Sequence, residues 1–254
     1  MLAFAPTIQA QSPPPAEPVA NPARPTVATP ATLTPVGYLQ FETGFLGASH
    51  SSEFSSRYSL NEVVKLSVAS RLELVGQMEP VAHSTLNGIS ANNAWDLYVG
   101  AQAVLYQGAG AKPTIAANYF YHVYDDGASS LDIESPTHQA ELLASADVKG
   151  FHYDANVFFT ELEQGPIRRA QFGQTISIAH PITQKITLAG ELWHFTQPFE
   201  RGNTIGNLWA VSYAQSKQLV FDAGFNKGLT GTSTRWEVFV GFTYLLPHRL
   251  WKSH

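Results

Sequence analysis

The side chains with the most evident capacity for chemistry in this sequence are nine histidines. His152 and Asp154 stand two positions apart, which places both on one face if the segment is a strand. His50 precedes Ser52 by two residues, so a hydrolase that pairs serine with histidine has to be considered. However, no His-x-x-x-His pair occurs, and spacing alone assembles no serine–histidine–acid grouping. Cysteine is absent, which excludes disulfides, thiolate nucleophiles and cysteine-rich zinc sites. We therefore expect no catalytic, cofactor-binding or metal-binding residues, and we interpret the histidines as scattered polar groups.

The elements that position these groups are strands, because apolar and polar residues alternate along the chain. Residues 234–246 carry their large apolar side chains at every second position, namely Trp236, Val238, Val240, Phe242 and Tyr244. Glu237, Gly241 and Thr243 lie between them. The same period of two recurs in residues 71–78, 96–105, 151–160 and 219–226. The pattern predicts strands with one apolar face and one polar face.

About twelve such segments follow one another after a proline-rich start. We expect strands near residues 36–46, 59–68, 71–79, 94–106, 113–124, 136–148, 151–161, 170–179, 185–196, 206–215, 218–227 and 234–246. Connections after the even-numbered segments are short, and those after the odd-numbered segments are mostly longer and polar. Short turns at one end and long loops at the other are typical of outer-membrane barrels. The sequence therefore predicts an all-β fold, a transmembrane antiparallel up-and-down β-barrel of about twelve strands.

The apolar face of such a sheet meets either a second protein layer or lipid. Lipid is favoured because the segments are long enough to span a bilayer and only 14% of residues are charged, against about 25% in soluble proteins. No run of about 18 apolar residues occurs, so no transmembrane helix is expected. The net charge is −5 and there is no basic run, which argues against a nucleic-acid partner. Aromatic residues near segment ends predict an interfacial girdle, formed by Tyr38, Trp95, Tyr106, Tyr124, Trp193, Trp236 and Tyr244.

The polar face would then line the lumen of the barrel. The lumen-lining residues we expect are Glu42, Lys65, Arg71, Glu73, Asp96, Gln102, Glu141, Asp154, Glu191, Asp222 and Glu237. Asp147, Lys185 and Arg235 are further charged candidates. Acidic groups dominate this set, which favours cations or neutral solutes if the bore is open. Alternatively, the charges pair across strands and fill the barrel with a salt-bridged core.

The chain before the barrel divides into two pieces. Residues 1–10, "MLAFAPTIQA", look like the second half of a secretory signal peptide without its basic start, so we expect the true start upstream or Met1 inside a longer signal. Residues 11–35 contain eight prolines and predict an extended, disordered leader, because proline supports neither helix nor ladder. The barrel then occupies residues 36–246, and residues 247–254 form a C-terminal tail.

Several short blocks resemble one family of outer-membrane barrels. They are "RPTVATPATLTPVGYLQFETGF" (24–45), "SRLELVGQ" (70–77), "WDLYVGAQ" (95–102), "FDAGFNKGL" (221–229) and "VGFTY" (240–244). In this order and spacing they are similar to the meta-pathway phenol-degradation family, whose members are also described as transporters. The likeness covers most of residues 24–244. It implies uptake of aromatic or other hydrophobic compounds.

The sequence departs from that family at three places. Val36 separates Pro35 from Gly37, which the family tends to join, and Gln102 stands where a basic residue is common. The chain also continues past the last strand as "LLPHRLWKSH" (245–254), whereas outer-membrane barrels usually end on a strand-terminal aromatic residue. The last departure puts the assembly signal in doubt, with Tyr244 and Trp251 as substitutes.

Three functions follow, in this order of preference. The first is a channel or transporter for small, aromatic or hydrophobic molecules in the outer membrane of a Gram-negative-type bacterium. The second is an outer-membrane enzyme that acts on lipid, and the third is a structural or adhesive barrel whose long loops carry the function. The expected partners are outer-membrane lipid, small hydrophobic or aromatic solutes and the outer-membrane assembly machinery, with no nucleic acid and no cofactor.

Overall fold

A computed structural model describes residues 17–51, 54–93, 96–124, 136–164 and 166–251. Its strands are β1 (Leu39–Ser49), β2 (Ser56–Ala69), β3 (Leu72–Leu86), β4 (Ile89–Asn93), β5 (Asp96–Tyr106), β6 (Thr114–Tyr124), β7 (Pro136–Val148), β8 (Phe151–Gln164), β9 (Ile167–Pro181), β10 (Ile186–Thr196), β11 (Asn203–Ala214), β12 (Leu219–Gly228) and β13 (Trp236–Leu245). No helix in these ranges is long and apolar enough to cross a membrane.

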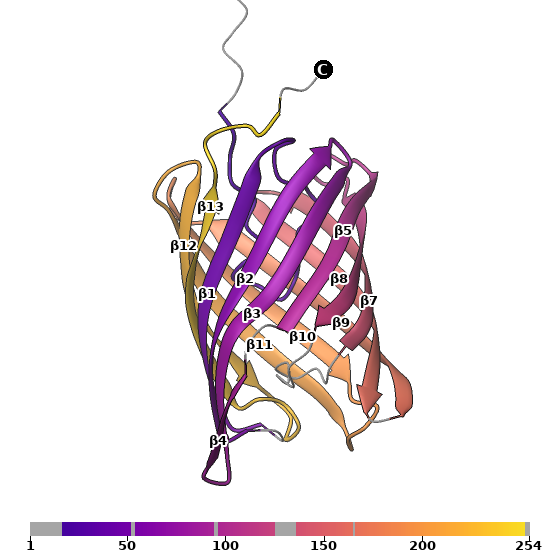
Figure 1. Cartoon of the computed structure of the whole chain (residues 1–254). Coiled ribbons are helices and arrows are strands. Elements are labelled where there is room, and N and C mark those ends of the chain that lie inside the picture. The colour runs from indigo at the N-terminus through magenta and orange to yellow at the C-terminus, as the bar shows by residue number, and fades with distance from the viewer. Residues whose placement is uncertain (1–16, 52–53, 94–95, 125–135, 165, 252–254) are drawn as a thin grey trace, which may run out of the picture.

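The strands close into a barrel. Each strand pairs antiparallel with its neighbours, β1 pairs with both β2 and β13, and β2 pairs with β3, so twelve strands form a ring (Figure 1). The remaining strand, β4, pairs only with the far part of β3 and stands outside the ring. This confirms the predicted fold class. It differs from the prediction at residues 80–93, expected as a loop, where β3 continues and forms a hairpin with β4.

The two ends of the barrel differ in their connections. The turns after β2, β5, β7, β9 and β11 lie at the upper end in Figure 1, where β1 begins and β13 ends; we call this the short-turn end. The β3–β4 hairpin lies at the lower end, which we call the long-loop end. Two short turns have only two residues; in one of them, Lys149–Gly150, both residues have positive φ, 53° and 85°. Two consecutive positive φ values define the hairpin turn whose twist matches antiparallel strands.

The wall is one strand thick, so its side chains point alternately outward and into the barrel. On β13, Trp236, Val238 and Val240 are 40%, 60% and 55% exposed, whereas the intervening Glu237 and Phe239 are each 8% exposed. Large apolar side chains are exposed in this way on the other strands of the ring as well. Such a surface is stable against lipid and would be a liability in water.

The expected aromatic girdle needs one correction. Tyr106 and Trp236 are exposed near opposite ends of the barrel, as a girdle requires. Trp193, in contrast, is only 3% exposed and points inward, because it shares the inward face of β10 with Glu191 while Leu192 faces outward. Trp95 lies outside the described residues.

The N-terminal segment, residues 17–37, enters at the short-turn end and occupies the barrel interior. The backbone N–H of Ala20 donates to the carbonyl of Lys217 in the β11–β12 turn, at 2.8 Å. Farther in, Ala28 and Ala31 are fully buried, and Ala31 packs against Val104 of the wall. The segment forms no helix or strand, as its prolines predict, but it is not extended: it bends at residues 24–28 and folds back, so that the Asn21 amide donates to the carbonyl of Thr32 at 2.8 Å. The expected disorder of the leader does not hold for residues 17–35, because the wall supplies hydrogen-bond partners that the segment cannot supply itself; residues 11–16 lie outside the described ranges.

Candidate functional site

The N-terminal segment is held in the lumen by acidic side chains that accept its backbone N–H groups. The N–H groups of Ala23 and Arg24 each lie 3.1 Å from Oε2 of Glu42 on β1. Those of Val27 and Ala28 donate to Oε2 and Oε1 of Glu191 on β10, both at 2.7 Å. Hydrogen bonds to a charged acceptor are about twice as strong as neutral ones. The two glutamates therefore fix residues 23–28 across the middle of the bore.

Three further contacts hold the part of the segment that returns to β1. Ala31 N–H donates to the Ser145 hydroxyl on β7 at 2.7 Å, and Thr34 N–H donates to a Glu73 carboxylate oxygen on β3 at 2.8 Å. The Gln102 amide on β5 donates to the carbonyl of Pro30 at 2.9 Å. A proline-rich chain cannot form a ladder, so its remaining polar groups are satisfied singly by different strands.

Residues 17–37 contain one cation, Arg24. Its side chain adds to the contacts with Glu42 and Glu191, which together we call the seat of the segment. Its Nη2 and Nε lie 3.1 Å and 3.3 Å from the two carboxylate oxygens of Asp222 on β12. The Asp222 side chain is 2% exposed and the Arg24 side chain 17%. Gly44 and Gly241 on the adjoining strands β1 and β13 leave the space, because a Cβ at either position would overlap the Arg24 guanidinium. The two wall glycines and the arginine therefore fit as a set.

The structure buries the predicted lumen residues with one exception. Ten of them are at most 8% exposed, namely Glu42, Lys65, Glu73, Asp96, Gln102, Glu141, Asp154, Glu191, Asp222 and Glu237. Arg71 is not a lumen residue: it is exposed in the turn between β2 and β3, because β2 already ends at Ala69. The further candidates Asp147, Lys185 and Arg235 are also exposed, at the ends of the barrel.

Some of the buried charges are paired, as one of the two sequence interpretations expects, whereas Glu141 and Glu191 accept hydrogen bonds from neutral groups. Lys65 lies 2.5 Å from Glu42, Arg57 pairs with Glu79, and His122 pairs with Asp96. These pairs connect neighbouring wall strands. The wall also pairs with the N-terminal segment through Arg24 and through backbone N–H groups, which strand alternation alone does not predict.

Sequence analysis missed an aromatic cluster on the lumen wall. The Phe195 ring centroid lies 5.3 Å from that of Phe158 and 6.0 Å from that of Trp193, and all three side chains are at most 5% exposed. The Trp193 indole N–H donates to the Asn226 side-chain oxygen at 2.8 Å. The sequence does indicate this position for two of the rings. Trp193 and Phe195 stand two and four residues after Glu191 on the same strand, so they face the lumen as Glu191 does.

Beside this cluster lie polar side chains that the protein itself does not satisfy. Asn156 and Thr160 flank Phe158 on β8, and Gln171 pairs with Thr160 across to β9. All three are at most 1% exposed, and no protein group of the described chain lies within hydrogen-bonding distance of their amide and hydroxyl atoms. Buried polar groups of this kind require water or a ligand as partner.

The N-terminal segment divides the lumen into cavities. On the long-loop side, two adjoining cavities of about 240 Å³ and 330 Å³ are lined by wall residues that include Trp193 and Phe195 in the first and Glu79 and Tyr98 in the second. On the short-turn side, a third cavity of about 330 Å³ reaches the β9–β10 turn. Arg24 and Thr26 line all three, so the segment stands between the two sides.

The histidine candidates do not form a hydrolase site among the described residues. His152 lies 2.8 Å from Asp147 and 3.2 Å from Asp154. Ser145 donates its hydroxyl to Asp154 instead of to the imidazole, so the proton path of a serine nucleophile is missing. His50 sits in the β1–β2 loop, and its candidate partner Ser52 lies outside the described ranges. No group of three metal-binding side chains occurs in the part of the chain that the structure describes.

Comparisons with known proteins identify the fold. No protein-family model and no curated protein matches the sequence. Among solved structures, the COG4313 outer membrane channel from Pseudomonas putida F1 is similar, with a TM-score of 0.60 and 11% identity over 85% of this chain and 98% of that chain. The NanC porin has a TM-score of 0.57 and 12% identity, over 82% and 100%. The CymD monoaromatic hydrocarbon channel has a TM-score of 0.51 and 9% identity, over 85% and 90%. The chain therefore has the fold of outer-membrane channels.

Proposed function

We propose that this chain is an outer-membrane channel or transporter for small, neutral aromatic molecules. The fold supports a membrane-spanning barrel, and the resemblance to the meta-pathway phenol-degradation family supports the same class of solute. The observation that carries the proposal is the aromatic cluster of Phe158, Trp193 and Phe195, which lies inside the barrel beside a cavity of about 240 Å³. A lumen that passes only hydrated ions gains nothing from buried aromatic rings.

The chemistry of the wall narrows the class of solute. Aromatic rings prefer edge-to-face or offset contacts with other rings, each worth about 0.5–1.5 kcal/mol beyond the area that is buried. The Asn61 side chain lines the same cavity as Trp193 and Phe195 and offers an amide donor and acceptor to a polar substituent. A single-ring aromatic molecule with a hydroxyl group matches both features.

Charge argues for a neutral solute. The inward carboxylates, Glu42, Glu73, Glu79, Asp96, Glu141, Asp154, Glu191, Asp222 and Glu237, face only Arg24, Arg57 and Lys65 as permanent cations in the described lumen. An anionic solute would meet repulsion from this set, whereas a neutral one would not.

The barrier to passage is the N-terminal segment at Arg24–Thr26, which lines cavities on both sides. Its contacts to the wall are hydrogen bonds and ion pairs that water can replace. We infer that solute crosses when residues 23–28 leave their seat on Glu42 and Glu191.

The test compares an inward phenylalanine with an outward one. Phe195 on β10 lines the cavity and is 4% exposed, whereas Phe159 on β8 points outward and is 49% exposed. Uptake of 4-nitrophenol would be measured at about pH 5, where this phenol is neutral, in vesicles that contain lipopolysaccharide and the purified barrel as their only protein. We expect Phe195→Ala to slow uptake about tenfold, equal to roughly 1.4 kcal/mol of lost ring contact, and Phe159→Ala to leave it unchanged. A folded barrel that admits no solute, or equal rates for the two variants, would refute the proposal.

The β3–β4 hairpin favours adhesion as a second candidate function. It stands outside the ring and carries Leu86 and Ile89 at its tip, 41% and 77% exposed. Deleting residues 84–91 would abolish binding to a partner while leaving uptake of 4-nitrophenol unaffected. Loss of uptake in that variant would reject the separation of the two roles.

A further inference from the structure

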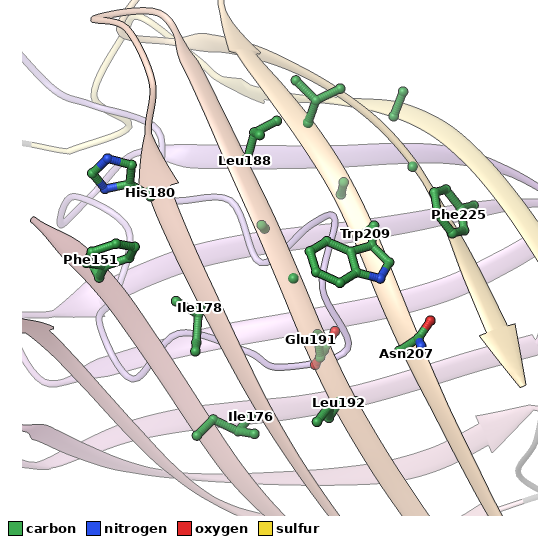
Figure 2. Close-up of a pocket in the computed structure, with 16 residues that line it drawn as sticks. Phe151, Ile176, Ile178, His180, Leu188, Glu191, Leu192, Asn207, Trp209 and Phe225 are labelled. Carbon is green, nitrogen blue, oxygen red and sulfur yellow. The ribbon is translucent and has the colours of Figure 1, made fainter. Parts of the chain in front are cut away.

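A groove of about 750 Å³ crosses the outer wall of the barrel over β9–β12 (Figure 2). It exists because two outward positions carry almost no side chain. Gly190 stands between the outward-facing Leu188 and Leu192 on β10. Ala223 faces outward on β12, where it pairs with Val211. The Trp209 ring lies over Gly190, with ring atoms 3.1–3.5 Å from the position that a Cβ would take. The volume falls within the range of roughly 300–1,000 Å³ that is usual for ligand sites.

The outward side chains along the groove are apolar except at its two ends. His180, stacked on Phe151 with 4.5 Å between ring centroids, marks the short-turn end, and Asn207 marks the other (Figure 2). Glu191 contributes no charge, because its carboxylate is turned into the lumen toward Val27 and Ala28. The groove is therefore a site for a hydrocarbon chain.

Two lysines flank the short-turn end of this groove. His180 Nδ1–H donates to the carbonyl of Gly150, the residue after Lys149, at 2.9 Å. Lys185 Nζ lies 5.9 Å from the centre of the Tyr213 ring. Tyr213 pairs with Ile186, two positions along the strands from the Leu188–Val211 pair that lines the groove. Both lysines are exposed, and neither forms an ion pair with any described residue. Their ammonium groups are available to a negative headgroup.

The two lysines belong to a wider pattern. Each of the five short turns carries one basic residue, namely Arg71, Lys112, Lys149, Lys185 and Lys217. Exposed basic residues also occur at the long-loop end, namely Arg168, Arg169, Arg201 and Arg235, so the feature that singles out Lys149 and Lys185 is their place beside the groove. Basic side chains at a membrane interface attract anionic lipid, each by about fivefold in affinity.

We propose that the groove binds one anionic glycerophospholipid, with an acyl chain over Gly190 and Ala223 and the phosphate between Lys149 and Lys185. The dimensions agree. Six residues separate Tyr213 from Asn207 on β11, about 20 Å along a strand. At a tilt of roughly 40° this covers about 15 Å of depth, half of a hydrocarbon core about 30 Å thick. The lipid therefore comes from the leaflet at the short-turn end. The inference depends on the barrel spanning a membrane but not on solute passing through its lumen.

The experiment measures lipid retained by the intact chain. Barrels would be placed in nanodiscs of phosphatidylethanolamine with 20% phosphatidylglycerol, released from them, and examined by native mass spectrometry. Lys149→Gln with Lys185→Gln removes both ammonium groups, and Ala223→Leu fills the groove. Lys112→Gln is the matched control, because it removes an exposed basic residue from another short turn. Uptake of 4-nitrophenol by each variant would be recorded in parallel.

We expect the unaltered chain to retain one phosphatidylglycerol. The double lysine variant should retain it about 25-fold more weakly, since two fivefold attractions are lost. Ala223→Leu should also lose it, and Lys112→Gln should keep it. Equal retention in all variants, equal losses in Lys112→Gln and the double variant, or retention of phosphatidylethanolamine alone would overturn the proposal. A failure of solute uptake with normal lipid retention would count only against the proposed function.

Discussion

Arg24→Ala tests whether the N-terminal segment is held by the contacts described for it. Arg24 makes a two-pronged ion pair with Asp222, at 3.1 Å and 3.3 Å, and the Asp222 side chain is 2% exposed. Removing one partner of a buried pair costs about 3–5 kcal/mol, because the other charge is left without compensation. Arg24 is 17% exposed, which places the cost near the lower limit. About 3 kcal/mol corresponds to an increase of roughly 100-fold in the population whose segment has left its seat.

The absence of cysteine provides the assay. Ala28 is fully buried, so Ala28→Cys introduces a single thiol that a maleimide reaches only when the segment leaves its seat. The labelling rate of the folded barrel in liposomes then reports the unseated population. We expect labelling about 100-fold faster when Arg24→Ala is added to this background.

A double-mutant cycle separates the ion pair from a general loosening of the barrel. Arg24→Ala combined with Asp222→Ala removes both charges, so the buried carboxylate no longer lacks a partner. Labelling of the double variant should be roughly ten times slower than labelling with Arg24→Ala alone. Identical labelling with and without Arg24, or effects that simply multiply, would show that the ion pair does not hold the segment.

Two further predictions concern the same interior. Gly44→Ala should also make maleimide labelling of Ala28→Cys faster, because the new Cβ would overlap the Arg24 guanidinium. Gly76→Ala should leave the labelling rate unchanged, because nothing lies within 4 Å of a new Cβ there. Similar rates for the two glycine variants would contradict the proposed fit. Lys65→Met should lower the free energy of unfolding by about 3 kcal/mol in urea titrations of the folded barrel, because Glu42 loses the cation 2.5 Å away. An unchanged midpoint and slope would show that Lys65 is not needed to compensate Glu42.

The strand pattern was predictable from sequence because a barrel wall has only two faces. The outward row of β13, with Val238 and Val240, alternates strictly with Glu237 and Thr243, and the structure exposes and buries them accordingly. The ring of twelve follows from local alternation and turn lengths. The hairpin at β4 was missed because five residues, "ISANN", carry no apolar period.

The occupied lumen was not predictable in the same way. Residues 17–35 have no periodicity, and their partners Glu42, Glu73 and Glu191 lie on three different strands. Each contact joins one backbone N–H to one distant carboxylate, and nothing near residues 17–35 in the sequence marks the pairing. The aromatic cluster lies between these cases. Strand parity counted from Glu191 would have placed Phe195 inside, although both faces of β10 are rich in large side chains.

The position of the N-terminal segment has a consequence for the order in which this protein assembles. Residues 17–37 lead directly into β1, and β1 closes the ring only by pairing with β13. Before β1 and β13 pair, the wall is open between them, and the Arg24 side chain can enter the lumen from the side. After they pair, the segment can reach or leave the lumen only through an end of the barrel, where Arg24 must come in to meet Asp222. Pairing of β1 with β13 is therefore the last step at which residues 17–37 can enter the lumen through the wall.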